Sequence, residues 1–142
     1  MAAFLQKLIS LFMTLLAMFG LGKNITDPAA VKLDDTASYV LSEDKIAFTF
    51  VSNPSTGYNW SYTLKGGSVK LSKESFEASN NRNAAGAPGK QHYTFTAVKQ
   101  GASTITFIYE RPWENNDPVY TYVAKITVDA SGQISLDSFT ET

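Results

Sequence analysis

The sequence NPSTGYNWSYTL (residues 53–64) joins a stiff polar turn to a segment that alternates like a β-strand. Pro54 fixes its own φ and favours an extended conformation at Asn53, while Gly57 tolerates a left-handed conformation or a close approach of another chain segment. The side chains of Ser55 and Thr56, like that of Asn53, are short and polar and can hold a turn by hydrogen bonds to the nearby backbone.

Large apolar side chains follow this turn at every second position, which is the period of a half-buried strand: Tyr58, Trp60, Tyr62 and Leu64. We therefore expect a rigid polar loop clamped at its far end by buried aromatic rings, with Trp60 as its structural support. An ordinary connecting turn is the alternative reading of the loop.

Strand-like alternation continues on both sides of this stretch, and turn residues separate the segments at fairly regular spacing. No amphipathic helix is evident after residue 22. This pattern predicts an all-β protein, an immunoglobulin-like antiparallel β-sandwich of seven or eight strands. The further strands are expected at residues 36–41, 45–51, 69–76 (with a break), 90–98, 103–110 and 119–128, and a short one at 133–136.

The first 22 residues differ from the rest of the chain. Residues 8–21 are nearly all apolar, and Lys7 is the only charge before residue 23. The run is short for a membrane span, which needs about 20 apolar residues, and suits the apolar region of a secretory signal. We predict a cleaved signal peptide (1–22), a lead-in (23–35) and one sandwich domain (36–142). An uncleaved membrane anchor and a packed amphipathic helix are the alternatives.

Composition excludes several classes of function. The chain has 142 residues, which fits one domain, and a net charge of −1 with no block of like charges, so we expect no nucleic-acid partner. It has no cysteine and one histidine, His92, which removes disulfides, thiolate nucleophiles and histidine-rich metal sites. We expect no cofactor, no metal, no catalytic residue and no enzymatic activity.

Three unusual connections are expected to meet at one end of the sandwich. Residues 52–57, 78–89 and 111–118 fall between the second and third, fourth and fifth, and sixth and seventh predicted strands, and those connections share one end of a seven-strand sandwich. Trp113 lies in the last of them, between Pro112 and a glutamate, and either caps the core or is exposed as a binding anchor. Trp and Arg are over-represented at interface hot spots, which favours a binding surface.

Three motifs in these loops, taken in order, resemble those of the chagasin-type inhibitors of cysteine peptidases. They are Asn53-Pro54-Ser55-Thr56-Gly57-Tyr58 with Trp60, then Gly86-Ala87-Pro88-Gly89, then Arg111-Pro112-Trp113. The resemblance spans roughly residues 30–128. Ser55 stands where the family usually has threonine, and Pro88 stands where it usually has glycine.

The resemblance implies an immunoglobulin-like sandwich that blocks papain-like cysteine peptidases reversibly and without covalent chemistry. It implies that loop 53–57 enters the catalytic cleft, with Thr56 and its neighbours near the enzyme's cysteine and histidine. Loops 86–89 and 111–113 would straddle the cleft, with Trp113 packed on the enzyme beside it. We expect a monomer without a membrane-bound mature domain, located in the secretory pathway (secreted, periplasmic or lysosomal/vesicular).

Two rival functions use the same scaffold. An immunoglobulin-like adhesion or carbohydrate-binding module could use the same loops, with Tyr120, Tyr122 and Trp113 stacking on sugars. A purely structural sandwich domain would use none of them.

Overall fold

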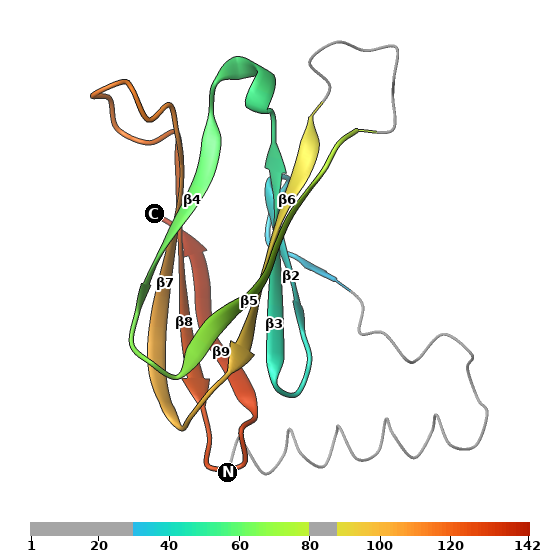
Figure 1. Cartoon of the computed structure of the whole chain (residues 1–142), viewed down its shortest axis with the longest axis vertical. Coiled ribbons are helices and arrows are strands. Elements are labelled where there is room, and N and C mark those ends of the chain that lie inside the picture. The colour runs from blue at the N-terminus through green and yellow to red at the C-terminus, as the bar shows by residue number, and fades with distance from the viewer. Residues whose placement is uncertain (1–29, 80–87) are drawn as a thin grey trace, which may run out of the picture.

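Two antiparallel β-sheets packed face to face make up this protein in the computed structural model, which describes residues 30–79 and 88–142 (Figure 1). The predicted all-β sandwich is confirmed, with nine strands in the described residues rather than seven or eight. The strands are β1 (Val31–Lys32), β2 (Ala37–Leu41), β3 (Lys45–Ser52), β4 (Asn59–Lys65), β5 (Val69–Glu77), β6 (Gly89–Ala97), β7 (Gly101–Glu110), β8 (Tyr120–Val128) and β9 (Ile134–Glu141), and one short 3-10 helix, η1 (Pro54–Thr56), lies between β3 and β4.

The extra strand and one extension lie where the sequence pattern is weak. β1 has only two residues, both exposed, and falls in the stretch that we expected to be a lead-in. β9 runs from Ile134 to Glu141, well beyond the short strand expected at 133–136. The break expected in residues 69–76 is a β-bulge between Leu71 and Lys73 within a continuous β5.

The strands divide between the sheets in the orders β1-β2-β3-β6-β5 and β4-β7-β8-β9. All strand pairings are antiparallel. The chain therefore crosses from one sheet to the other between β3 and β4, and η1 lies on this crossing (Figure 1).

Aromatic side chains fill the space between the sheets. Ile46, Phe48 and Phe50 of β3 are fully buried, as the placement of large apolar residues at every second position predicts. The Phe107 ring, from the opposite sheet, lies 4.9 Å from that of Phe48 and 4.7 Å from that of Phe50, measured between centroids. Trp60 is 8% exposed, which confirms its assignment to the buried face of β4.

Strand register places both ends of each long loop at the same end of the sandwich. In the five-stranded sheet, Ser52 at the end of β3 pairs with Gly89, and Glu77 at the end of β5 pairs with Lys90. In the other sheet, Asn59 at the start of β4 pairs with Glu110 at the end of β7. The three connections β3–β4, β5–β6 and β7–β8 thus leave and re-enter one end, which we call the tip (Figure 1).

The predicted signal peptide lies outside the described residues. The alternatives for residues 1–22, an anchor or a packed helix, also lie there. Within residues 30–79 and 88–142, no helix is long and apolar enough to cross a membrane.

Candidate functional site at the tip

The first tip loop is a tight turn held by its own polar groups. The amide of Gly57 donates to the Pro54 carbonyl oxygen at 3.0 Å, and Gly57 has a left-handed φ of 86°. The Thr56 hydroxyl donates to the Asn53 carbonyl oxygen at 2.6 Å, and the Ser55 hydroxyl donates to the Asn53 side-chain oxygen at 2.6 Å. The three residues of η1 are exposed, so the loop combines a fixed backbone with an accessible surface.

Two aromatic residues support this loop from the sandwich. Trp60 stacks on Phe50 with ring centroids 4.3 Å apart, and its indole nitrogen donates to the Val51 carbonyl oxygen at 2.9 Å. The Tyr109 hydroxyl accepts a hydrogen bond from the Asn53 amide at 3.0 Å. The loop therefore rests on a rigid aromatic base, as the alternating pattern after Gly57 predicts.

Arg111, at the start of the loop between β7 and β8, joins this loop to the first one. Its Nε donates to the Thr56 carbonyl oxygen at 3.0 Å, and its guanidinium lies 4.4 Å from the centroid of the Tyr58 ring. A second guanidinium nitrogen donates to the Glu114 carboxylate at 3.1 Å. Arginine is suited to such a position because its planar group stacks and donates in several directions at once.

Trp113 is the most exposed large apolar side chain among the described residues, at 69%. It does not cap the core, so this alternative is wrong. Its ring instead lies against Gly57, where a Cβ atom would come within 2.5 Å and 2.8 Å of two ring carbons. Glycine is therefore needed at position 57 for two reasons: the left-handed backbone conformation and the Trp113 ring, which leaves no room for a side chain.

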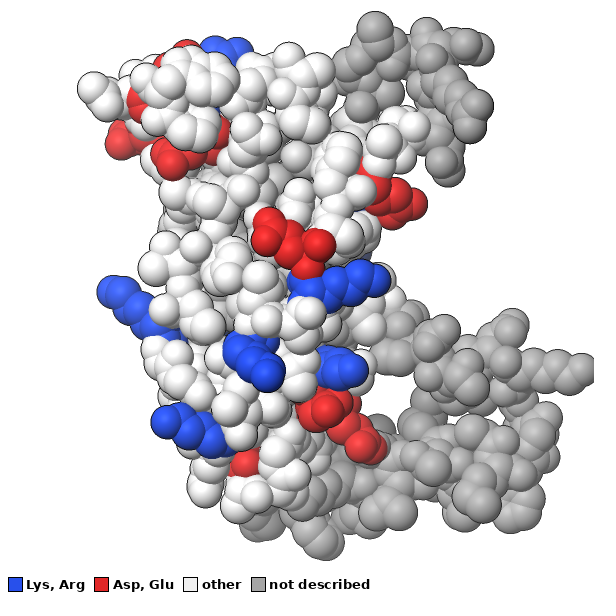
Figure 2. Space-filling model, in the orientation of Figure 1, with Lys and Arg blue, Asp and Glu red and all other residues white. Residues whose placement is uncertain are grey.

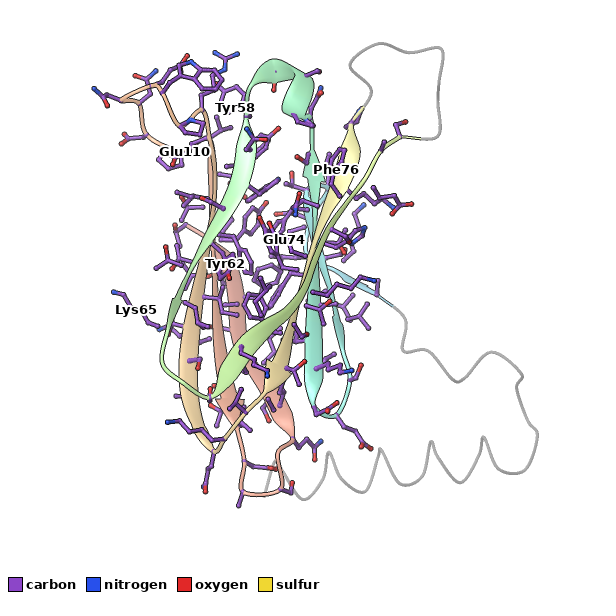
Figure 3. The ribbon with its side chains drawn as sticks, viewed as in Figure 1. Tyr58, Tyr62, Lys65, Glu74, Phe76 and Glu110 are labelled. Carbon is purple, nitrogen blue, oxygen red and sulfur yellow. The ribbon has the colours of Figure 1, made fainter. Side chains whose placement is uncertain are left out.

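The middle loop is described only at its end. Gly86 and Ala87 lie outside the described residues, and Pro88 is exposed. Gly89 is buried and begins β6, one residue earlier than expected. A Cβ atom there would come within 2.4 Å of the Glu77 carbonyl oxygen and 2.6 Å of the Phe76 ring, which lies at this end of β5 (Figure 3).

Sequence reasoning missed two residues of the tip. Neither Tyr109 nor Glu114 is among the site residues predicted from the sequence. The contact of Glu114 with Arg111 could have been predicted, because the two residues are three positions apart in the sequence. The Tyr109 contact depends on how the crossing from β3 to β4 folds over the end of β7, which the alternation of β7 does not reveal.

His92 is held by its neighbours on the outward face of the five-stranded sheet. Its Nδ1 lies 2.9 Å from the Thr49 hydroxyl, and its Nε2 lies 3.2 Å from the Glu77 carboxylate. Both partners belong to the strands that flank β6. Among the described residues, no group of three or more His, Cys, Asp or Glu side chains could hold a metal ion.

The sugar-stacking platform expected from Tyr120 and Tyr122 is wrong. Tyr122 is fully buried, and its hydroxyl donates to the Asp34 carboxylate at 2.8 Å. Tyr120 is partly buried and lies parallel to the Trp60 ring at 6.4 Å. Of the three aromatic residues in that hypothesis, Trp113 alone is exposed, at 69%.

The chain is similar to known proteins both in sequence and in structure. Residues 39–128 match the family described as chagasin family peptidase inhibitor I42. Amoebiasin-2 of Entamoeba histolytica is 30% identical over 84 residues, which cover 58% of this chain and 68% of that protein. The crystal structure of the cysteine protease inhibitor EhICP2 from Entamoeba histolytica has a TM-score of 0.56 and 26% identity, covering 63% of this chain and 83% of that one.

The family match begins within β2, ends with β8 and includes all three tip connections. It agrees with the resemblance identified from the loop motifs. The matched family consists of inhibitors rather than enzymes, which confirms that the chain is not an enzyme. This chain therefore belongs to the chagasin family of peptidase inhibitors.

Proposed function

We propose that this protein is a reversible, non-covalent inhibitor of papain-like cysteine peptidases and that its tip occludes their active-site cleft. Membership of the family supports peptidase inhibition, and the name of EhICP2 supports cysteine peptidases as the class of target. The observation that carries the cleft-blocking mode is the first loop, a turn fixed by internal hydrogen bonds whose residues are all unburied.

In this mechanism, loop 53–58 enters the cleft as a wedge. η1 folds the backbone into a tight turn, whereas a peptidase cleft accepts an extended peptide. No scissile bond then lies in attack geometry, so the peptidase cysteine has nothing to acylate. The inhibitor contains no cysteine, so it forms no mixed disulfide with the enzyme, and dissociation restores both proteins.

Uncharged residues form the leading surface of the wedge. The five residues from Asn53 to Gly57 carry no charge. Figure 2 shows uncharged atoms at η1, charged groups on the neighbouring β7–β8 loop, and most basic groups of this face further down the sheets. A neutral surface enters a narrow cleft without the large desolvation penalty of a buried charge. Thr56 would lie deepest, near the enzyme's cysteine and histidine.

The flanking loops would hold the enzyme on either side of the wedge. Trp113 supplies a large, exposed ring already positioned by its contact with Gly57. Residues 86–89, together with Pro112, complete the proposed contact set. Because the first and third loops are fixed before binding, little conformational entropy is lost on docking. The proposed inhibitor acts as a monomer in the secretory pathway after removal of residues 1–22.

Titration of papain with this protein, followed with a fluorogenic peptide, tests the proposal. A stoichiometric loss of rate that recovers on large dilution is expected. No loss of rate would contradict the proposed target class, and loss without recovery would contradict reversibility. Sequencing the N-terminus of the mature protein from its native source tests the signal peptide, with Lys23 expected first.

A further inference from the structure

The η1 turn is held at both ends by two residues, one near the end of β7 and one in the loop that follows it. Tyr109 accepts a hydrogen bond from the Asn53 amide, which precedes the turn, and Arg111 donates to the carbonyl oxygen of Thr56, which ends it. Both bonds are 3.0 Å long. We propose that Tyr109 and Arg111 are positioning residues that keep loop 53–57 in its docking conformation. This inference rests on the proposed function.

Tyr109 is too deeply buried to contact a docked peptidase, so it can affect inhibition only by positioning the loop. Its side chain is 9% exposed and packs between the rings of Tyr58, at 5.4 Å, and Trp60, at 4.8 Å. A peptidase docked at the tip would touch loop 53–57 before it could reach this ring. The hydroxyl is therefore a fixed acceptor for the Asn53 amide, and its contribution to inhibition passes through that amide.

Arg111 is committed to contacts within the inhibitor. Its Nε is bonded to Thr56, one terminal nitrogen is bonded to Glu114, and the face of its guanidinium covers Tyr58. Glu114 and Arg111 have side chains only about one-third exposed, at 32% and 34%. The resemblance to the family assigned Arg111 to contact with the peptidase. Its contacts indicate instead a brace, meaning a positioning residue that holds the first and third loops together.

A brace and a contact residue have different kinetic signatures. Weakening a brace lowers the fraction of free inhibitor whose loop is ready to dock, and the association rate constant falls in proportion. The bound complex keeps its contacts with the enzyme, so the dissociation rate constant is unchanged. Loss of a contact residue mainly raises the dissociation rate constant.

The experiment measures both rate constants with papain for Tyr109→Phe, Arg111→Met and Arg111→Lys. Tyr109→Phe keeps the buried ring and removes only the acceptor, so the fold is retained. Each of the three variants should lower the association rate constant by about fivefold or more, with an unchanged dissociation rate constant. Arg111→Lys keeps the charge but not the planar donor group, so it should not restore the wild-type rate. Trp113→Ala is the matched contact control and should raise the dissociation rate constant.

Amide hydrogen exchange gives a readout that needs no peptidase. Tyr109→Phe should speed exchange of the Asn53 amide by about fivefold or more, because this amide loses its acceptor. An unchanged exchange rate of the Asn53 amide in Tyr109→Phe would overturn the proposal that Tyr109 holds the loop, whatever the inhibition data show. An unchanged association rate, full rescue by Arg111→Lys, or a raised dissociation rate in Tyr109→Phe would also overturn it. If the wild-type protein fails to slow papain, the proposed function fails, and the exchange of Asn53 still decides whether Tyr109 holds the loop.

Discussion

The indole nitrogen of Trp60 donates a 2.9 Å hydrogen bond to the carbonyl oxygen of Val51. Val51 lies in β3 of the five-stranded sheet and Trp60 in β4 of the other sheet. The bond thus joins the two sheets directly beneath the first tip loop, where the chain crosses between them. This relationship couples the stability of the sandwich to the placement of the loop.

Replacing Trp60 should therefore affect the whole fold. Trp60→Ala removes a buried ring that stacks on Phe50 and should lower the free energy of unfolding by about 3–5 kcal/mol. Trp60→Phe, the matched control, keeps an aromatic ring and loses the bond to Val51, so it should cost about 1–3 kcal/mol. Denaturant unfolding followed by circular dichroism measures both. Wild-type stability in the alanine variant would show that the ring is not part of the core.

Thr56 should matter for inhibition far more than for stability. Thr56→Asp places a charge at the leading point of the proposed wedge, where it would be buried without a partner, and should weaken inhibition of papain by roughly a hundredfold. The threonine is exposed, and both hydrogen bonds of its hydroxyl, to the Asn53 carbonyl oxygen and from the Tyr58 amide, are exposed as well, so the thermal midpoint should change little. Thr56→Ser keeps the hydroxyl and serves as the control. Equal inhibition by the aspartate variant and the wild type would remove loop 53–57 from the interface.

Gly57 and Trp113 should behave as a coupled pair. A Cβ at position 57 meets the indole of Trp113 and also requires a left-handed φ, which costs roughly 1–2 kcal/mol for other residues. Gly57→Ala should weaken papain inhibition about tenfold or more. The same substitution should have a smaller effect in a Trp113→Ala background, where the clash is absent. Equal effects in both backgrounds, measured as a double-mutant cycle, would argue that the two residues are independent.

Acid should destabilise the protein through Asp34. Burial raises the pKa of this carboxyl, but hydrogen bonds from the Tyr122 hydroxyl and two backbone amides outweigh burial, so the pKa lies below its usual value. Because the folded pKa is depressed, the stabilisation is present above the unfolded pKa of about 4 and is lost as the pH falls through the folded pKa.

Asp34→Asn tests this pH dependence. The free energy of unfolding of the wild type should fall as the pH drops below about 4, and the variant should show a shallower fall, since position 34 no longer titrates. Denaturant unfolding at several pH values measures this difference. Identical pH profiles would mean that Asp34 carries none of the acid sensitivity.

The fold was predictable because most strands bury one face. Ile46, Phe48 and Phe50 alternate with outward residues, and such a pattern has one sensible register in a sandwich. β1 escaped prediction because its two exposed residues have no alternation, and its position follows from pairing with β2. The motifs of the first and third loops could be recognised because each is a short run of neighbouring residues. The bonds of Arg111 to Thr56 and of Tyr109 to Asn53, in contrast, join residues about 55 positions apart. Such contacts follow from the tertiary arrangement and not from any local pattern.

The most direct test of a tip that blocks the cleft is amide hydrogen exchange on this inhibitor, alone and with papain whose catalytic cysteine has been replaced by alanine. We expect protection of residues 53–58 and 111–118 in the complex, with no change in the turns at the opposite end, residues 98–100 and 129–132. Protection at those opposite turns, with the tip exchanging as in the free protein, would contradict this expectation.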